Sequence, residues 1–322
     1  MNNWAVVVPT NRPDRFAHFI DSWAAQFKRH NAYLIVVQDL PEQSDEIAGA
    51  LQGRGISHEL HDWHSITAAH IPRRTDMIRS WGIYRAWATG REFTLTLDDD
   101  VSPTTDVFRE YEDVFAAGAS HSRYLDIGGA LTTFGGQMRG FPFRDRKPAE
   151  VVVQYGGWDG ILDYDAPTQL AGVKEQEWFT QVVVPVPVGA AATCCIMNAA
   201  WRTEYAPIMW QLPLFGGRFN RFGDIWSGLL QKRTLDVTGG VMVVNGRALV
   251  RHARASDPVA NLEREAPGIP LNEGLWEELC SRPATDYWSV TDAAYSHFLW
   301  VDSEYAEHFK AARDEWKRLF HQ

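Results

Sequence analysis

Short runs of apolar and β-branched residues alternate with longer segments of helical periodicity over the first hundred residues. The apolar runs predict strands, whereas apolar residues that recur every three or four positions predict helices. The expected strands are residues 4–8, 33–37, 57–60 and 93–97, and the expected helices are residues 14–30, 44–51 and 75–89. Such alternation is typical of an α/β fold, with a Rossmann-like, mostly parallel sheet and helices on both faces.

The second half of the chain is patterned differently. Gly and aromatic residues crowd residues 134–158, and the valine run at 182–188 is broken by prolines, which favours an edge strand. Residues 238–244 predict a further strand. We expect a sheet-based domain over residues 1–270 and a helical C-terminal region over residues 271–322 packed on it. The packing residues expected in that region are Trp276, Leu279, Tyr287, Phe298, Trp300 and Phe309.

Composition narrows the class of protein. The 322 residues are 45% hydrophobic and include 14 tryptophans, enough for a large core and an aromatic ligand pocket. A net charge of −10 without a cluster of Lys and Arg argues against nucleic-acid binding. Cys194, Cys195 and Cys280 show no metal-ligand spacing, which indicates a reduced, cytoplasmic protein. We expect neither a signal peptide nor a membrane span, because no sufficiently long apolar run is present.

The acidic run Asp98-Asp99-Asp100 directly follows the strand expected at residues 93–97. Ligands usually bind at the carboxyl edge of an open α/β sheet. Three carboxylates repel one another unless a cation lies between them, and oxygen ligands suit Mn²⁺ or Mg²⁺. The pattern predicts a cation that also holds the diphosphate of a nucleotide sugar, and the alternative is a solvated acidic turn. No G-x-G-x-x-G follows the first strand, so NAD is not expected.

Five strings then occur in a fixed order along the chain. They are FTLTLDDD at residues 93–100, RGFPF at 139–143, DYDAPTQL at 163–170, RFGDIW at 221–226 and HARASDP at 252–258. Together they resemble the reversibly glycosylated polypeptide family, which includes the plant UDP-arabinopyranose mutases. The resemblance runs to about residue 268. It implies a glycosyltransferase A-like fold, a divalent metal and no flavin.

The resemblance assigns the metal-binding carboxylates to the acidic run. We predict Asp100 as a direct ligand, with Asp98 or Asp99 contacting the ribose or a ligand water. His252 would complete the coordination through a neutral imidazole, and the alternative is a capped surface histidine. The predicted metal set is therefore Asp99, Asp100 and His252, with Asp98 assigned to substrate.

The family's sugar-carrying arginine falls on Arg139, and a second arginine that the family needs falls on Arg146. A guanidinium has a pKa above about 12 and no lone pair, so covalent attachment to Arg139 requires an adjacent carboxylate or a desolvated site. The alternative is a bidentate clamp on the diphosphate. Asp224 stands where the family usually has paired acids, and Gly223 replaces the first of them. Asp224 is thus the only acid available at this point for proton transfer or for contact with the sugar.

The remaining predicted residues contact the substrate. Asp163 and Asp165 would accept hydrogen bonds from sugar hydroxyls, and the alternative is a loop stabilised by their side chains. Trp158 would offer the sugar an apolar face. The resemblance adds Pro9, Thr10, Asp39 and Arg79. Residues 62–74 depart from the family pattern, so uracil and guanine both stay open as the base.

Together these residues predict a metal-dependent, flavin-independent mutase that interconverts the pyranose and furanose forms of a UDP- or GDP-linked sugar. The anomeric bond would break, Arg139 would hold or stabilise the glycosyl group, the ring would reclose, and the nucleotide would re-add. A retaining or self-glycosylating glycosyltransferase is the alternative, and an inactive binding subunit is a third reading. The expected partner is a nucleotide sugar. Nucleic acid and membrane are not expected, and a homo-oligomer is compatible with the sequence.

Overall fold

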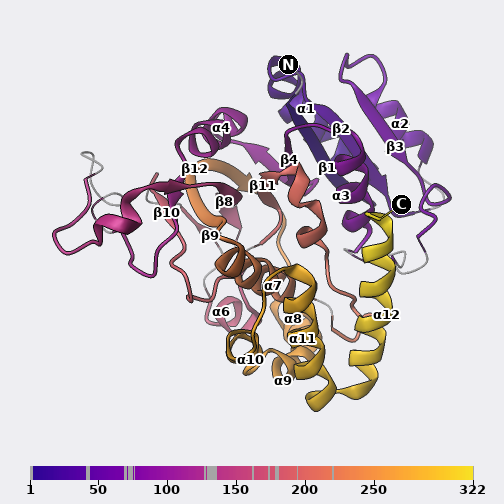
Figure 1. The fold of residues 1–322 in the computed structure, drawn as a ribbon. Helices are drawn as coiled ribbons and strands as arrows, with labels where there is room; N and C mark the ends of the chain where they lie inside the picture. Colours follow the sequence, from indigo (N-terminus) through magenta and orange to yellow (C-terminus); the bar gives the residue numbers. More distant parts are fainter. Residues whose placement is uncertain are drawn as a thin grey trace.

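A mixed sheet of ten strands runs through the part of the chain that the structure describes, and helices cover both of its faces (Figure 1). The computed structural model describes residues 3–40, 44–68, 71, 75, 77–126, 128, 136–161, 163–172, 175–177, 181–193, 195–219 and 221–321. The predicted α/β fold class is confirmed. No helix among these residues is both long enough and apolar enough to cross a membrane.

The first half of the sheet is parallel, as its strand–helix alternation predicts. Its order is β4-β1-β2-β3, and its elements are β1 (Trp4–Thr10), β2 (Tyr33–Gln38), β3 (His58–His61), β4 (Phe93–Leu97), α1 (Pro13–Arg29), α2 (Ser44–Leu51) and α3 (Ile78–Ala88). The expected elements are all present, and their boundaries differ by a few residues at most. Parallel strands carry their carboxyl ends to one edge, so the residues that follow β1, β2 and β4 meet there.

Alternate residues of β1 separate the two faces of the sheet. Trp4 and its even-numbered neighbours pack with α1 and with α4 (Val107–Ala117), whereas Val7 packs with α3 on the opposite face. Gly82 lets α3 approach the sheet closely, because a Cβ there would lie 2.4 Å from Val7 Cγ1 and 3.0 Å from Val37 Cγ2. These contacts fix α3, which carries Arg79, against the sheet.

The second half of the sheet is mixed. Its order from the edge is β10-β12-β8-β11, and its strands are β5 (Val101–Pro103), β8 (Val151–Ile161), β9 (Glu175–Gln176), β10 (Val183–Pro185), β11 (Asn198–Arg202) and β12 (Val241–His252). The predicted edge position of the proline-broken strand is confirmed by β10. The strand expected at residues 238–244 begins later. Helix α7 (Gly223–Thr238) extends to Thr238, and Gly239 ends it with a φ of 91°.

The C-terminal helices begin at Pro258, before the expected residue 271. They are α8 (Pro258–Glu265), α9 (Ile269–Asn272), α10 (Leu275–Ser281), α11 (Tyr287–Val301) and α12 (Ser303–Leu319). Helices α9 to α12 share one hydrophobic cluster with α7 and with the sheet residue Trp201. Trp300 was expected to pack, and this is wrong, because its side chain is 87% exposed. It lies two residues beyond buried Phe298, about 200° around α11 and so on the outer face.

Candidate functional site

The strands β1 and β4 end side by side, and the acidic run begins there. Val7 of β1 pairs with Thr96 of β4, so both strands leave the sheet at the same edge. Thr10 Oγ1 donates to Asp99 Oδ2 at 2.7 Å, and the Asp99 carboxylate is buried. Burial raises the pKa of Asp99, although Arg12 and Thr10 partly counteract it. Thr10, which the resemblance assigns to substrate, therefore lies against the acidic run.

Arg12, two residues beyond β1, lies over the acidic run. Its guanidinium forms an ion pair with Asp99, and Nη2 lies 3.0 Å from Asp100 Oδ2. Burial lowers the pKa of Arg12, but Asp99 and Asp100 more than offset this and the net pKa is raised. One positive charge thus already lies between two of the three clustered carboxylates.

Arg79 of α3 holds Asp98 from another side. The buried guanidinium forms an ion pair with Asp98 and a hydrogen bond to the Thr96 hydroxyl, and it lies 3.4 Å from the Ile196 carbonyl oxygen. Burial raises the pKa of Asp98, but Arg79, helped by Arg12, outweighs this and the net pKa is lowered. Arg79 therefore keeps Asp98 ionised, and it lies within the site, as the sequence predicts.

His252 faces Asp100 because β12 ends beside β5. His252 pairs with Val101, the residue after Asp100. The imidazole Nδ1 lies 2.8 Å from the Ile161 carbonyl oxygen. A carbonyl only accepts, so Nδ1 carries a proton, and in the neutral form of the ring Nε2 would present its lone pair. That Nε2 lies 3.9 Å from Asp100 Oδ1.

This pair of atoms suits a divalent cation. Asp100 Oδ1 is buried and has no hydrogen-bond partner among the described residues, and His252 Nε2 faces it. Carboxylate oxygen and imidazole nitrogen are both ordinary ligands of Mn²⁺-like metals. Asp99 fits less well, since its two oxygens already accept from Thr10 and Arg12. Across the described ranges, no group of three or more His, Cys, Asp and Glu side chains is arranged to hold a metal.

Asp163 belongs to a second charged cluster, which follows β8. Its Oδ2 accepts from Cys195 Sγ at 3.2 Å, and its Oδ1 lies 3.5 Å from Arg221 Nη2. Arg221 also donates through Nε to Glu265 Oε1 at 2.7 Å. The other oxygen of Glu265 accepts from the Ala166 backbone N–H at 2.9 Å. Arg221 and Glu265 therefore anchor the segment that carries Asp163.

Asp165 is used differently from Asp163. It is the N-cap of α6 (Ala166–Leu170), where its carboxylate accepts from the Thr168 backbone N–H at 3.1 Å and from the Thr168 hydroxyl at 2.8 Å. This is the arrangement of the alternative interpretation, a loop stabilised by Asp side chains. Trp158 of β8 lies edge-on to the ring of Tyr164, with 5.9 Å between ring centres.

The charges of three of the predicted acids act on the thiol of Cys195. Burial raises its pKa well above the ordinary range, and the charges of Asp163, Asp224 and Asp98 raise it further. These three residues come from separate segments, and Asp224 lies in the first turn of α7. The fold thus brings Asp98, Asp163 and Asp224 around one protonated thiol.

Two further substrate predictions fall at the same edge of the sheet. The Asp39 backbone N–H donates to the Thr10 carbonyl at 3.0 Å, just beyond β2, and Asp39 is buried. Pro9 precedes Thr10 on β1 and is half-buried. Pro9 is bonded to Thr10 and Asp39 is hydrogen-bonded to it, and Thr10 in turn contacts Asp99 of the acidic run.

Arg139 and Arg146 lie in a lobe that stands out from the sheet at the left of Figure 1. This lobe carries β6 (Ala119–Ser120), η1 (Phe143–Arg146) and β7 (Pro148–Ala149). Arg139 is exposed, whereas Arg146 donates to the Phe141 carbonyl at 3.0 Å. Among the described residues, the ion pairs of the acidic run come from Arg12, Arg79 and Arg254 instead.

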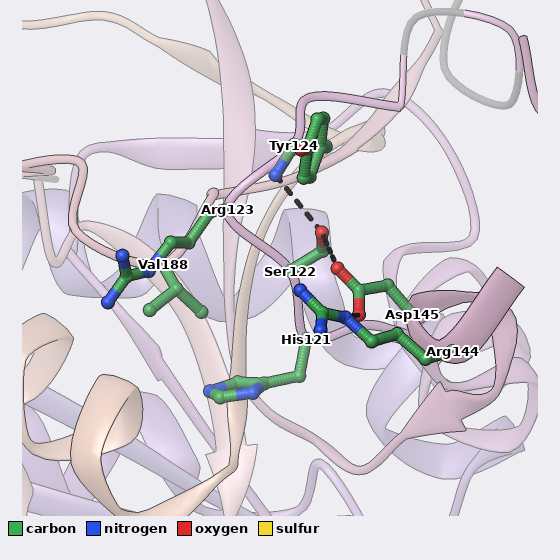
Figure 2. A pocket seen from close by; sticks show the side chains of 7 residues that line it. All are labelled: His121, Ser122, Arg123, Tyr124, Arg144, Asp145 and Val188. Atoms are coloured by element: carbon green, nitrogen blue, oxygen red, sulfur yellow. Dashed lines mark hydrogen bonds and ion pairs between the residues drawn. The ribbon is translucent and has the colours of Figure 1, made fainter. Parts of the chain in front are cut away.

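A surface hollow of about 230 Å³ lies in the same lobe (Figure 2). It is lined by His121, Ser122, Arg123, Tyr124, Arg144, Asp145 and Val188. The Ser122 hydroxyl donates to Asp145 at 2.7 Å and accepts from the Tyr124 backbone N–H at 3.0 Å. The lining that the structure describes contains none of the predicted site residues, so the hollow is separate from the acidic run.

The sequence did not single out Arg12, Cys195, Arg221, Arg254 or Glu265. Arg12 had a readable signal, since it follows the first strand at the edge where the acidic run emerges. Arg221 and Arg254 stand inside strings that were already quoted, and Arg254 Nη1 lies 3.7 Å from Asp100 Oδ2. For Cys195 and Glu265 no local pattern exists. Cys194 lies outside the described residues.

The sheet topology and its acidic edge define an α/β protein with a carboxylate site flanked by arginines. The family model for reversibly glycosylated polypeptides matches residues 132–312, more than half of the chain, and the protein belongs to this family.

The chain is 28% identical over 305 residues to the probable UDP-arabinopyranose mutase 1 of Zea mays, which covers 85% of this chain and 74% of the relative. It is 27% identical over 305 residues to UDP-arabinopyranose mutase 1 of Oryza sativa subsp. japonica, with the same coverage of 85% and 74%. Among solved structures, it is similar to the mannosyltransferase PcManGT from Pyrobaculum calidifontis in complex with GDP-Man and Mn²⁺. That likeness has a TM-score of 0.48 at 12% identity and covers 96% of this chain and 73% of the other.

Proposed function

We propose that this protein is a nucleotide-sugar mutase that interconverts the pyranose and furanose forms of a sugar linked to a nucleoside diphosphate. The observation that carries the proposal is the pairing of buried Asp100 Oδ1 with His252 Nε2 at the carboxyl edge of the sheet. Membership of a family whose relatives are named UDP-arabinopyranose mutases supports it.

Asp100 and His252 would hold Mn²⁺ or Mg²⁺, and Asp99 would keep Arg12 beside the site without being a ligand itself. Such cations are commonly held by one or two protein groups together with substrate phosphates and water. When bound, the cation would neutralise charge on the diphosphate as the sugar–phosphate bond breaks. The proposal involves neither a flavin nor NAD.

Arginines would contact the diphosphate part of the substrate, and aspartates would contact its sugar part. Arg12 and Arg254 carry positive charge toward the acidic run and suit a diphosphate. Asp98, Asp163 and Asp224 suit sugar hydroxyls, because ionised carboxylates accept hydrogen bonds. Arg79 keeps Asp98 ionised, so this carboxylate remains an acceptor at neutral pH. Trp158 would cover an apolar face of the sugar.

Arg139 would act on the glycosyl group or on the diphosphate. An exposed guanidinium keeps its charge, which suits the clamp. A covalent bond to the sugar would require desolvation of Arg139 once substrate is bound. Arg146 would support Arg139 from the same lobe.

The chain division is also a proposal. Residues 1–270 would carry the nucleotide-sugar site, and residues 271–322 would stabilise this domain by packing against α7. The shared cluster of Trp201, Trp226 and Phe298 supports this division of roles. The cytoplasmic location and the homo-oligomer stay predictions.

The test is to incubate the protein with Mn²⁺ and an NDP-sugar without any acceptor, and to separate the nucleotide products. UDP-arabinopyranose should give the furanose nucleotide, EDTA should stop the reaction and Mn²⁺ should restore it. Asp100→Asn should abolish turnover, whereas Asp113→Asn on the exposed face of α4 should not. Hydrolysis or self-labelling without a furanose nucleotide would instead indicate the glycosyltransferase, and full activity in EDTA would refute the cation.

A further inference from the structure

We propose that Arg12 is a resident counter-ion of the acidic run that competes with the divalent cation and moves to the nucleoside diphosphate when the nucleotide binds. Cation and nucleotide would then bind cooperatively, because each removes an obstacle to the other. This inference rests on the cation site proposed at Asp100 and His252.

The first step is that Arg12 already occupies the carboxylates. Its guanidinium forms an ion pair with Asp99 and contacts Asp100 Oδ2 at 3.0 Å. Asp100 Oδ1, on the same carboxylate, has no hydrogen-bond partner among the described residues. Asp100 thus presents one oxygen to an arginine and the other to His252 Nε2. A cation at Oδ1 would face the positive charge of Arg12 across a single carboxylate, and like charges at this range disfavour each other.

The second step is that Arg12 is the member of the cluster that can change partner. Its side chain is 28% exposed, whereas those of Asp99 and Asp100 are 1% and 2% exposed. The carboxylates are fixed by burial, and Asp99 is fixed by the Thr10 hydroxyl as well. Of the three side chains in these ion pairs, solvent therefore reaches Arg12 but hardly the two carboxylates, so an incoming nucleotide could contact Arg12 directly.

The third step is that a diphosphate offers Arg12 a better partner once a cation arrives. A guanidinium binds phosphate oxygens in the same bidentate manner in which it binds a carboxylate. Transfer of Arg12 to the diphosphate frees Asp100 Oδ2 and removes the competing charge. Arg254 lies 3.7 Å from the same oxygen, but its side chain is 53% exposed, so it is the weaker competitor.

This exchange has a thermodynamic signature. If the nucleotide removes a competitor of the cation, it raises cation affinity by some factor, and the cation raises nucleotide affinity by the same factor. In the Arg12→Gln protein the competitor is absent from the start. The cation should then bind more tightly on its own, and the nucleotide should improve that binding by a smaller factor.

The experiment measures Mn²⁺ binding at pH 7.5 by the loss of the free-Mn²⁺ electron paramagnetic resonance signal, with and without excess UDP. A protein-free blank corrects for the Mn²⁺–UDP complex. The variants are Arg12→Gln, Arg12→Lys and the control Arg15→Gln, which changes an exposed arginine of α1. Circular dichroism checks that each variant is folded.

We expect Arg12→Gln to bind Mn²⁺ about tenfold more tightly than wild type without UDP, and the enhancement by UDP to fall by about the same factor, within the usual range of coupled sites. Arg12→Lys keeps a charge without the planar fork and should lie between the two, which preserves the test if Arg12→Gln does not fold. Arg15→Gln should match wild type.

Weaker Mn²⁺ binding by Arg12→Gln in the absence of UDP, or an unchanged enhancement by UDP, would overturn the role of Arg12 and leave the cation site intact. Failure of every variant to bind Mn²⁺ even with UDP would overturn the cation site and this inference together. The mutase reaction itself is decided separately, by the nucleotide product of the wild-type protein.

Discussion

Arg221 Nε donates to Glu265 Oε1 at 2.7 Å and so joins the start of α7 to the end of α8. Arg221 has a φ of 74°, in the left-handed region that costs a residue with a side chain about 1 kcal/mol or more. The neighbouring contacts offset that strain. Burial lowers the pKa of Arg221, but Asp163, Glu265 and Asp224 more than offset this and the net pKa is raised.

Glu265→Gln should therefore destabilise the protein and lower turnover together. The amide keeps the shape but loses the charge that holds Arg221, and a hydrogen bond to a charged group contributes about 1.5–3 kcal/mol. Urea unfolding would measure the loss, and product formation would measure turnover. Glu263→Gln, on the exposed face of the same helix, is the control and should change neither. Equal stability of both variants would show that the Arg221–Glu265 pair does not support the site.

Substitutions of the two aspartates in the DYDAPTQL string should have different effects on stability and turnover. Asp165→Ala removes an N-cap side chain, so it should lower the free energy of unfolding by about 1 kcal/mol and leave turnover nearly unchanged. Asp163→Asn should lower turnover while free UDP binds normally, because Asp163 is assigned to the sugar. Calorimetry with UDP and a product assay distinguish the two. Normal turnover in Asp163→Asn would leave the string with a structural role only.

The parallel half of the fold could be predicted because its strands and helices show clear periods, whereas α7 and β8 could not. Helix α7 is buried around most of its surface, including Gln231 and Lys232, so its sequence lacks an apolar stripe. Strand β8 contains Gly156, which suggests a loop. The reason for this glycine is tertiary, since a Cβ there would lie 2.1 Å from Asn198 Nδ2 and 2.4 Å from the Ala248 carbonyl oxygen.

In the candidate site, too, some residues could be predicted from the sequence and others could not. The edge position of Asp100 follows from the strand before it, and His252 was found through a string. The contact of Arg12 with that edge needed the relative placement of two distant strands. The environment of Cys195 depends on three separate segments, which no local pattern describes.

Gly82→Ala should destabilise the fold although alanine favours a helix. The new Cβ would lie 2.4 Å from Val7 Cγ1, and a β-branched valine in a buried strand has little room to move. We expect a loss of about 1–3 kcal/mol in the free energy of unfolding, typical of overpacking. Gly49→Ala in α2, where no atom lies within 4 Å of the new Cβ, is the matched control. It should instead stabilise by up to about 1 kcal/mol through helix propensity.

Glu59 of β3 should make the stability depend on pH in the acidic range. Burial raises the pKa of Glu59, but the neighbouring His61 and the hydrogen bonds from Arg85 outweigh it and lower the pKa from 4.5 to about 2. The stabilisation is therefore full above pH 4.5 and is lost as the pH falls toward 2. At pH 7, Glu59→Gln should lose on the order of 2 kcal/mol, less than the whole shift implies because Arg85 is about a third exposed.

Urea unfolding at pH 7.0 and at pH 3.0 checks this expectation. The difference between wild type and Glu59→Gln should shrink at the lower pH, because Glu59 is then protonated in the unfolded chain but still mainly ionised in the folded protein. Glu46→Gln, at an exposed position of α2, should show no such dependence. A constant difference at both pH values would refute the assignment of the low pKa to these contacts.

Arg139→Lys should lose nearly all mutase turnover whichever role the arginine has. Lysine keeps the charge but not the planar, bidentate group, and loss of one such group from a charge-stabilising site costs roughly 10²–10³-fold in rate. Arg144→Lys, another exposed arginine of the same lobe, is the control and should retain activity. Intact-protein mass spectrometry after incubation with the donor then separates the two roles. A nucleophile gives one added glycosyl unit on the peptide that contains Arg139, whereas a clamp gives no adduct. Wild-type turnover in Arg139→Lys and in Arg139→Ala would exclude both roles and, with them, the arginine-assisted reaction.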